Sequence, residues 1–361
     1  MAPQDLESIS TSDLRTSVES VSIPTDAPEA EFTNWAKTFR CKPQRVFAPT
    51  TVEQCRAIME LARREGARLH PVGVGHSPSD LACTNGWLLR MAGVKGFIIV
   101  GVPLVLNASR LPLQSDKKQM TATFLGGTTL HEVHSSLQKC DPPLALRNIG
   151  SISDQTIGGL ISTASHGSGV TFPVLSQHVR SLKLALPLPG SPIVRVSPTE
   201  DQELFKSTLC GLGATGLILE VEIEVEDAFR LRETKTPCAV DEALDKLDEI
   251  KGSAEHVRLW WYPDGQGMVV GRANRVYEVW SMSCVSGQEL IVQRPEPTSS
   301  MIGHLLGYHL TQVFLYVSRL FPSFTPWVGR YAWWLANVET AVVDEGYKVL
   351  NFDCLVSHSH R

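Results

Sequence analysis

The chain has 361 residues, 43 % of them hydrophobic and 20 % charged, a composition typical of a globular protein with room for two domains. The formal net charge of −5 gives no electrostatic reason to expect a nucleic-acid partner. The eight cysteines are scattered without a CxxC pair, so the sequence predicts neither a zinc site nor a dense disulfide framework. A reducing intracellular compartment is the simpler expectation.

The N-terminal segment has no apolar run of the kind found in secretory signals, so we expect a protein that is not secreted. Its first 20 residues carry four acidic side chains against a lone Arg15, which argues against a mitochondrial transit peptide. Because the segment is rich in Ser, Thr, Pro and acids, we expect residues 1–31 to be a disordered tail. The glycosylation triplet Asn107-Ala-Ser109 is interpreted as a chance match.

Helix signals follow from residue 50 onward. Thr50 with Glu53 predicts a capping box, Gly66 ends the helix, and a strand is expected over 68–74. The apolar face of this first helix comprises Val52, Cys55, Ile58 and Ala62. A second helix begins at Thr129 with Glu132 as its capping partner and carries Leu130, Val133 and Leu137. A third helix covers roughly 201–209.

Strand signals divide the chain. Residues 218–226 alternate apolar side chains with glutamates, which predicts a half-solvated strand that closes a first, α+β or α/β domain. Beyond it, 241–250 is expected to be a helix. Residues 256–262 and 268–272 are expected to pair as a hairpin that begins a second, antiparallel domain.

The stretch 304–335 is apolar and rich in aromatic side chains. Pro322 and Pro326 break it, whereas a membrane-spanning helix needs about 20 mostly apolar residues. The polar side chains that interrupt it are His304, His309, Gln312, Arg319 and Arg330. We therefore expect buried or interfacial amphipathic helices here, with association with a membrane surface as an open alternative.

Two glycine-rich segments are candidates for chemistry. In 71–80, Gly73 and Gly75 allow a ligand to approach the backbone, and successive amides of such a turn form an anion-binding nest beside His76. The alternative is a tight turn with a hydrogen-bonding histidine. In 150–169, small Gly, Ser and Thr residues alternate with apolar ones, which suits a pyrophosphate and ribityl chain lying against backbone. The alternative there is a Gly/Ser loop between core elements.

Three other motifs are interpreted as structural. Gly211-Leu-Gly-Ala-Thr-Gly216 matches GxGxxG, but a helix precedes it and a strand follows, the reverse of a Rossmann unit, so we expect a turn that still has room to touch a ligand. His131 and His134 are one residue too close for a zincin motif and are interpreted as a helix surface. His358-Ser-His360 is too short to interpret. No metal site is predicted.

Taken together, the two glycine-rich segments resemble those of the aldonolactone oxidases in the vanillyl-alcohol-oxidase flavoprotein superfamily. The fungal D-arabinono-1,4-lactone oxidases are the closest branch, and the animal L-gulonolactone oxidases come next. Asn34-Trp35, Cys41-Lys-Pro43 and 255–262 also look like family segments. The motifs that carry the resemblance are Val72-Gly-Val-Gly-His-Ser-Pro-Ser-Asp80, Gly150-Ser-Ile-Ser-Asp-Gln-Thr-Ile-Gly-Gly159 and Ser165-His-Gly-Ser-Gly169.

The resemblance implies an α+β architecture: a two-subdomain, PCMH-type FAD-binding domain over 32–226, and a substrate domain with an antiparallel sheet and covering helices over 227–361. It also implies that FAD is bonded covalently to a ring nitrogen of His76, a link that makes the flavin a stronger oxidant. The residues implied to line the FAD are Gly73, Val74, Gly75, Ser77, Ser151, Ser153, Thr156, Ile157, Gly158, Ser162, His166 and Ile218.

The implied reaction oxidises a sugar 1,4-lactone at its C2 hydroxyl, with hydride passing to the flavin and O2 becoming H2O2, and gives an ascorbate-type product such as D-erythroascorbate. Family members are often attached to mitochondrial or other organelle membranes. The end of the chain, Leu355-Val-Ser-His-Ser-His-Arg361, does not resemble the family continuation. We therefore expect a truncated substrate domain, with the catalytic base and lactone-binding residues mostly beyond the chain end. A dehydrogenase that uses cytochrome c, an inactive FAD-binding protein and a flavin-free α+β binding domain remain alternatives.

Overall fold

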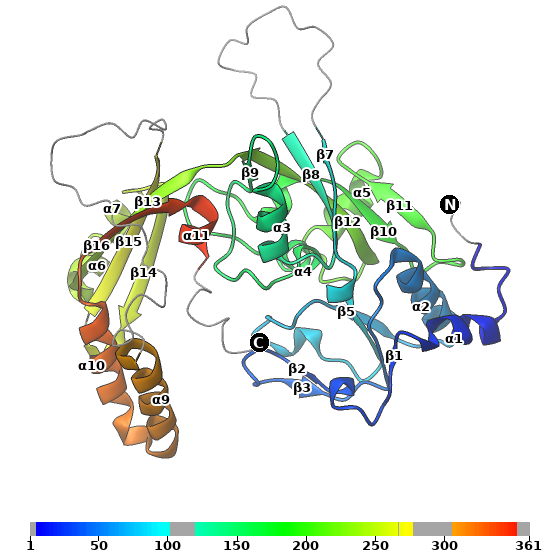
Figure 1. Cartoon of the computed structure of the whole chain (residues 1–361), viewed down its shortest axis with the longest axis horizontal. Helices are drawn as coiled ribbons and strands as arrows, with labels where there is room; N and C mark the ends of the chain where they lie inside the picture. Colours follow the sequence, from blue (N-terminus) through cyan, green and yellow to red (C-terminus); the bar gives the residue numbers. More distant parts are fainter. Residues whose placement is uncertain (1–4, 102–119, 266, 277–304, 352–361) are drawn as a thin grey trace, which may run out of the picture. The chain divides into compact units, whose positions relative to one another are not determined.

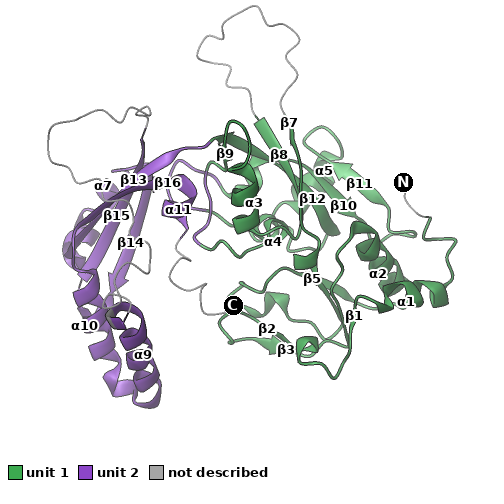
Figure 2. Ribbon diagram, viewed as in Figure 1, with its two compact units in different colours: residues 1–147, 152–166, 174–227 green, residues 148–151, 167–173, 228–361 purple. Residues whose placement is uncertain are grey.

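The computed structural model describes residues 5–101, 120–265, 267–276 and 305–351. Of the motifs discussed above, the Asn107 triplet and the His358–His360 pair lie outside the described residues. The chain forms two compact units, coloured separately in Figure 2. Unit 1 comprises Met1–Arg147, Ile152–His166 and Val174–Asp227, and unit 2 comprises Asn148–Ser151, Gly167–Pro173 and Ala228–Arg361.

The first sheet of unit 1, which includes the strands labelled β1 and β5 in Figure 1, has the strand order β1-β4-β6-β5. Its three pairings differ in direction: β1 runs antiparallel to β4, whereas β4, β6 and β5 are parallel to one another. A small antiparallel pair, β2 with β3, lies between β1 and β4 in the sequence. The strand bounds are Ser22–Ile23, Phe32–Thr33, Arg40–Cys41, Arg45–Phe47, Leu69–Val72 and Trp87–Arg90 for β1 to β6.

Helix α2 (Val52–Arg64) begins one residue later than the sequence suggested. Thr51, with extended backbone, is the N-cap, and Gln54 is its capping-box partner, so the predicted pair Thr50 and Glu53 is wrong by one residue. Both frames satisfy the capping pattern, and the frame observed makes Cys55, Ile58 and Ala62 buried as predicted. Gly66, with φ of +62°, follows the helix end, as expected.

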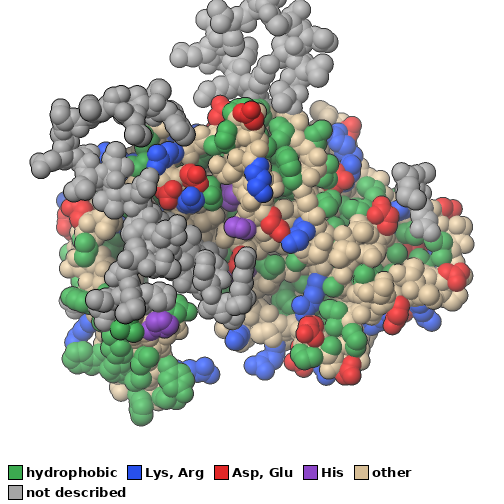
Figure 3. All heavy atoms as spheres, viewed as in Figure 1, with side chains coloured by type: hydrophobic (Ala, Val, Ile, Leu, Met, Phe, Trp, Pro, Cys, Tyr) green, Lys and Arg blue, Asp and Glu red, His purple; other side chains and the backbone are tan. Residues whose placement is uncertain are grey.

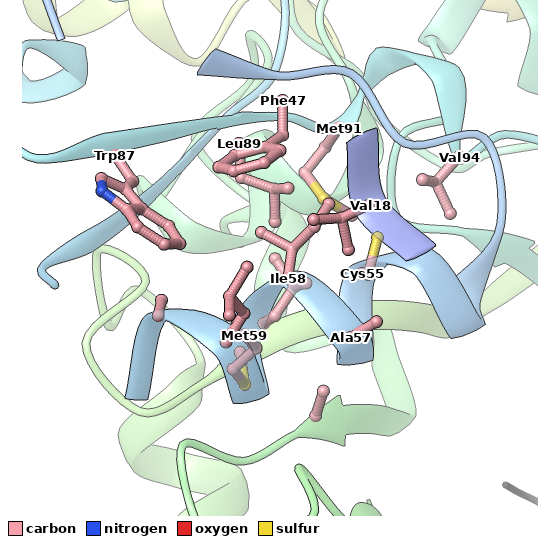
Figure 4. Close-up of a cluster of buried hydrophobic side chains, with 14 of the residues drawn as sticks. Val18, Phe47, Cys55, Ala57, Ile58, Met59, Trp87, Leu89, Met91 and Val94 are labelled. Carbon is pink, nitrogen blue, oxygen red and sulfur yellow. The ribbon is translucent and has the colours of Figure 1, made fainter. Parts of the chain in front are cut away.

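The prediction of a disordered N-terminal tail is wrong for the described residues from Asp5 onward. Helix α1 (Thr11–Glu19) lies there, capped by Ser10, and its Leu14 and Val18 are fully buried. They pack with α2 in the core cluster shown in Figure 4. Arg64 of α2 also donates hydrogen bonds to the Leu6 and Ile9 carbonyl oxygens. A polar composition therefore concealed a helix whose apolar side chains are spaced four residues apart.

The second sheet of unit 1 is antiparallel, in the order β11-β10-β12-β8-β7, with β9 also paired to β12. Helices α3 (with the predicted Thr129–Glu132 capping box) and α5 (capped by Asp201) confirm the second and third predicted helices. The strands are β7 Phe97–Gly101, β8 Met120–Leu125, β9 Leu144–Ala145, β10 Val179–Ala185, β11 Ile193–Val196 and β12 Leu217–Asp227, and the helices are α3 Leu130–Leu137, α4 Ile157–Ser162 and α5 Gln202–Thr208.

Strand β12 is a central strand, and its glutamate face is not the solvated face that alternation suggested. Glu224 is 7 % exposed and pairs with His178 and, at short range, Arg180 of the neighbouring strand region. Glu222 accepts hydrogen bonds from Ser181 at 2.5 Å and from Thr121 at 3.0 Å. Cross-strand partners therefore satisfy carboxylates that the local pattern had assigned to water.

The sheet of unit 2 is antiparallel in the order β14-β15-β13-β16. The predicted hairpin is confirmed, since β14 pairs with β15 in continuous register from His256↔Ala273 to Tyr262↔Gly267. The helix predicted over 241–250 is present but is divided at Lys246 into α6 and α7. The bounds are β13 Arg230–Ala239, α6 Val240–Asp245, α7 Leu247–Lys251, β14 His256–Tyr262, β15 Gly267–Val276, β16 Thr340–Glu345 and α11 Gly346–Leu350.

The apolar segment of unit 2 forms a π-helical turn (Leu305–Leu310) followed by helices α9 (Thr311–Leu320) and α10 (Thr325–Ala336). Helix α10 rests on the β14–β15 turn, where Trp333 lies 5.7 Å from the Tyr262 ring. Among the described residues, none of the helices has the length and apolar character needed to cross a bilayer.

Candidate functional site

Unit 1 contains a pocket whose empty volume is about 920 Å³ when the space open to solvent is counted. Three segments form it: the glycine turn after β5, helix α4 with the residues around it, and the turn before β12. The lining residues are His70, Pro71, Val72, Gly73, Val74, Gly75, His76, Ser77, Leu81, Ala82, Met91, Gly126, Gln155, Thr156, Gly158, Gly159, Leu160, Ser162, Thr163, Ser165, Leu212, Gly213, Gly216, Leu217 and Ile218.

Two glycines of the lining are required by close packing. A Cβ at Gly73 would lie 2.4 Å from Thr156 Oγ1, and a Cβ at Gly158 would lie 2.8 Å from the Gly126 carbonyl oxygen. The Gly158 amide donates to that same oxygen at 2.8 Å, which fixes the start of α4 against the end of β8. Side chains at these positions would separate the segments that enclose the pocket, so the glycines keep its walls as bare backbone.

His76 is half-buried in the lining, and its Nδ1 is fully buried without a hydrogen-bond partner among the described residues. An imidazole nitrogen left in this state costs free energy unless something else satisfies it. The nitrogen belongs to a residue that lines the pocket. A ligand bonded to the ring, or donating to it, would remove that cost.

The turn before β12 contributes to the pocket, as the reversed GxGxxG motif allowed. Leu212 and Gly213 both have positive φ, of 54° and 78°, and both line the pocket. The motif lies between α5 and β12 and opens no helix, so the prediction of a turn instead of a Rossmann unit is confirmed.

The structure brings together nine of the thirteen residues implied for the cofactor: Gly73, Val74, Gly75, His76, Ser77, Thr156, Gly158, Ser162 and Ile218. It does not bring Ser151, Ser153, Ile157 or His166 into the lining. Ile157 is fully buried in the core, and its amide donates to the Thr128 carbonyl oxygen. The Ser153 carbonyl oxygen accepts from the His131 amide, while Ser151 and His166 are exposed.

Sequence reasoning missed several polar lining residues, among them His70, Gln155, Thr163 and Ser165. Burial lowers the pKa of His70, and a hydrogen bond with the Leu81 backbone, which raises this pKa, offsets only part of the effect. The imidazole that lines the pocket is therefore neutral at neutral pH. The available signal was position in the sequence: His70 lies in β5 just before the glycine turn, Gln155 precedes α4, and Thr163 and Ser165 follow it.

The His131–His134 pair is not a helix surface with two exposed histidines, because His134 is buried. Burial, and secondarily the charge of His131, lowers the pKa of His134 to about 4. Within the described ranges, no three His, Cys, Asp or Glu side chains are grouped so that they could hold a metal ion.

Comparisons with known proteins give the family. A family model described as FAD binding domain matches residues 43–191, and one described as D-arabinono-1,4-lactone oxidase matches 221–361. An L-gulonolactone oxidase from Scyliorhinus torazame is 32 % identical over 328 residues, which is 90 % of this chain and 67 % of that protein. The chain belongs to the aldonolactone oxidase family of FAD-dependent proteins. A D-arabinono-1,4-lactone oxidase from Candida albicans is also 32 % identical, over 90 % of this chain and 56 % of its own length.

The fold agrees with this family. A cholesterol oxidase from Brevibacterium sterolicum superposes with a TM-score of 0.62 at 16 % identity, covering 91 % of this chain and 63 % of that one. The predicted α+β architecture, with a PCMH-type FAD-binding domain and antiparallel strands in the C-terminal part, is therefore confirmed. The chain spans about two thirds of the length of the gulonolactone oxidases and somewhat over half that of the fungal lactone oxidases.

Proposed function

We propose that this chain holds FAD in the pocket of unit 1 and that a ring nitrogen of His76 is bonded covalently to it. The observation that carries the proposal is the buried, unpartnered Nδ1 of His76, a residue that lines this pocket. The glycine-walled backbone around Gly73 and Gly158 supports it, since walls without side chains let a bulky dinucleotide lie close to the backbone. Thr156, Ser162 and Ser165 add hydroxyl groups at the same pocket.

We further propose that the activity is oxidation of an aldono-1,4-lactone of the D-arabinono type at its C2 hydroxyl, with O2 as acceptor and an ascorbate-type product. When bound, FAD supplies the hydride acceptor and its reoxidation by O2. The residues of unit 1 contribute binding and orientation: the His76 ring anchors one end, and the turn at Leu212–Gly213 encloses the pocket from the β12 side. Membership of the aldonolactone oxidase family supports the substrate class.

The cofactor proposal is tested by denaturing purified protein, precipitating it with acid and measuring flavin absorbance in the pellet. Wild type and His70→Ala should retain yellow colour, because His70 borders the same pocket without carrying the bond. His76→Ala should release all flavin to the supernatant. Retention by His76→Ala, or colourless wild-type protein before denaturation, would contradict the proposal.

The reaction is tested by adding a panel of aldonolactones to flavin-loaded protein and following H2O2 release. Turnover of D-arabinono-1,4-lactone with H2O2 formation supports the oxidase. Turnover only with cytochrome c identifies a dehydrogenase, and bound flavin that no lactone reduces identifies an FAD-binding protein without this activity.

We also propose that α9 and α10 lie on a membrane surface and that the protein works inside the cell at an organelle membrane such as that of the mitochondrion. Figure 3 shows hydrophobic side chains gathered over these helices. The stretch 305–336 contains Arg319 and Arg330 and no acidic residue, a combination suited to anionic lipid. Its exposed apolar side chains include Leu305, Val313, Leu315, Tyr316, Leu320, Trp327, Trp334 and Leu335.

Vesicle flotation tests this second proposal. Wild type should float with vesicles that contain anionic phospholipid, and a double substitution, Trp327→Ser with Trp334→Ser, should reduce the floating fraction several-fold. Trp261→Ser, which alters an equally exposed tryptophan on β14, is the control and should float normally. Absence of wild-type flotation would contradict the proposal. Subcellular fractionation with organelle markers tests the location.

A further inference from the structure

The turn from Asn34 to Phe39 holds the backbone on both sides of His76. The Trp35 amide donates to the Gly75 carbonyl oxygen at 3.0 Å. The Asn34 side-chain amide donates to the Ser77 carbonyl oxygen at 3.2 Å. Two consecutive residues of one turn thus bind the carbonyl groups immediately before and after the histidine. Local rotation of residue 76 would break at least one of these bonds.

The holding turn is itself fixed. Asn34 is only 2 % exposed, and its Oδ1 accepts from the Thr38 and Phe39 amides at 2.9 and 3.1 Å. The Asn34 amide in turn donates to the Phe39 carbonyl oxygen at 3.1 Å. Phe32, at the base of the same hairpin, lies so close that a Cβ at Gly75 would be 3.1 Å from its ring. Asn34 therefore joins a closed turn to the His76 loop.

Trp35 also touches the histidine ring itself. Its indole stacks on the His76 imidazole with centroids 5.9 Å apart and an interplanar angle of 29°. The indole remains 54 % exposed, so burial in the core does not account for a tryptophan at this position. Offset stacking has a preferred geometry, so the indole restricts the ring rotation of an imidazole whose Nδ1 lacks a hydrogen-bond partner among the described residues.

We propose that Trp35 is a positioning residue for covalent attachment of the flavin: it fixes the plane of the His76 imidazole so that a ring nitrogen is presented to the pocket. This inference rests on the covalent attachment proposed above. In net terms, the imidazole N–H and the flavin 8α methyl C–H each lose one hydrogen, a C–N bond forms, and O2 becomes H2O2. Restricting the imidazole to the reactive orientation raises the rate of that bond formation without changing its balance.

The experiment is a time course of acid-stable flavin incorporation. Protein produced under riboflavin limitation is mixed with FAD in air, and samples are precipitated with acid. Trp35→Leu, which keeps an apolar side chain without a ring, should incorporate flavin roughly tenfold more slowly than wild type, a factor set by the energy of an aromatic contact. Trp35→Phe, which retains a ring, should stay within about threefold. Trp261→Leu, an exposed tryptophan in unit 2, should match wild type.

Two further readouts separate positioning from folding. The unfolding midpoint of each variant and its reversible FAD binding, measured by flavin fluorescence quenching before attachment, should equal those of wild type. Equal incorporation rates for Trp35→Leu and wild type would overturn the role proposed for Trp35 but leave the covalent attachment in place. So would equal slowing in Trp35→Phe and Trp35→Leu, because the ring would then not matter. If wild type gains no acid-stable flavin at all, the proposed covalent attachment is refuted, and the role proposed for Trp35 is refuted with it.

Discussion

Lowering the pH should destabilise unit 1 through His134. The side chain is 3 % exposed, and burial, then the charge of His131, lowers its pKa from 6.5 to about 4. Because the folded pKa lies below the unfolded one, the unfolded chain binds the proton first. The stabilising contribution is therefore complete above pH 6.5 and is lost as the pH falls from 6.5 toward 4.

The magnitude follows from the shift. At 1.36 kcal/mol per pH unit, the full interval corresponds to about 3 kcal/mol, of which about 2 kcal/mol is lost by pH 5. His256 in unit 2 has a pKa lowered to about 4 in the same way, by burial, so wild type contains a second contribution of this sign. Comparing wild type with a His134 variant isolates the contribution of His134.

The assay is urea unfolding of wild type, His134→Gln and His131→Gln at pH 7.5, 6 and 5. Wild type should lose stability along this slope. The control His131→Gln changes an exposed residue of the same helix and removes only the smaller cause of the shift, so it should lose nearly as much stability as wild type. For His134→Gln, the free energy of unfolding should fall less steeply with decreasing pH, by the equivalent of about one bound proton. This variant should therefore lose about 2 kcal/mol less than wild type by pH 5. Parallel curves for wild type and His134→Gln would refute the reasoning, since they would mean that His134 titrates normally in the folded state.

Three further predictions concern local packing. Gly158→Ala should destabilise the fold by about 1–3 kcal/mol and weaken flavin binding, because its Cβ would meet a fixed backbone oxygen at 2.8 Å. Gly159→Ala, with only the Thr156 hydroxyl at 3.1 Å, should be neutral or gain up to about 1 kcal/mol of helix propensity; thermal unfolding compares the two. Thr129→Ala should cost about 0.5–2 kcal/mol by removing the α3 capping box, measured by urea unfolding. The Cys55 thiol, whose pKa burial raises to about 12, should resist iodoacetamide at pH 8 in folded protein, whereas exposed Cys210 reacts; mass spectrometry of the labelled peptides checks this.

Elements with complete local signals were predictable. The capping box at Thr129 and the alternation over 218–226 each lie within one element, so neighbours in sequence carry the information. The glutamate face of β12 was not predictable in this way, because its partners come from other strands. Ser181 and Thr121, for example, approach Glu222 from β10 and β8. The sequence pattern of a strand shows which side chains alternate in burial, but it does not show which side chains of the neighbouring strands will contact them.

The same limit applies to the candidate site. The glycine turn containing His76 was found because its composition is itself the signal. In the second segment, composition identified the loop but not its orientation. Helical spacing places Gly158 and Ser162 on the pocket side of α4, while Ile157 and Ile161 are buried in the core. The Asn34–Trp35 turn is recognisable only by its resemblance to family segments, since no local pattern relates it to a loop about forty residues later.

The most direct test of the central claim is to locate the flavin in the sequence. Purified protein is digested with pepsin, the flavin-absorbing peptide is isolated, and tandem mass spectrometry identifies the modified residue. The account predicts one flavin peptide containing 72–80, with the added mass on His76. Flavin on another residue of the pocket, such as His70, or flavin recovered entirely as free FAD, would contradict it.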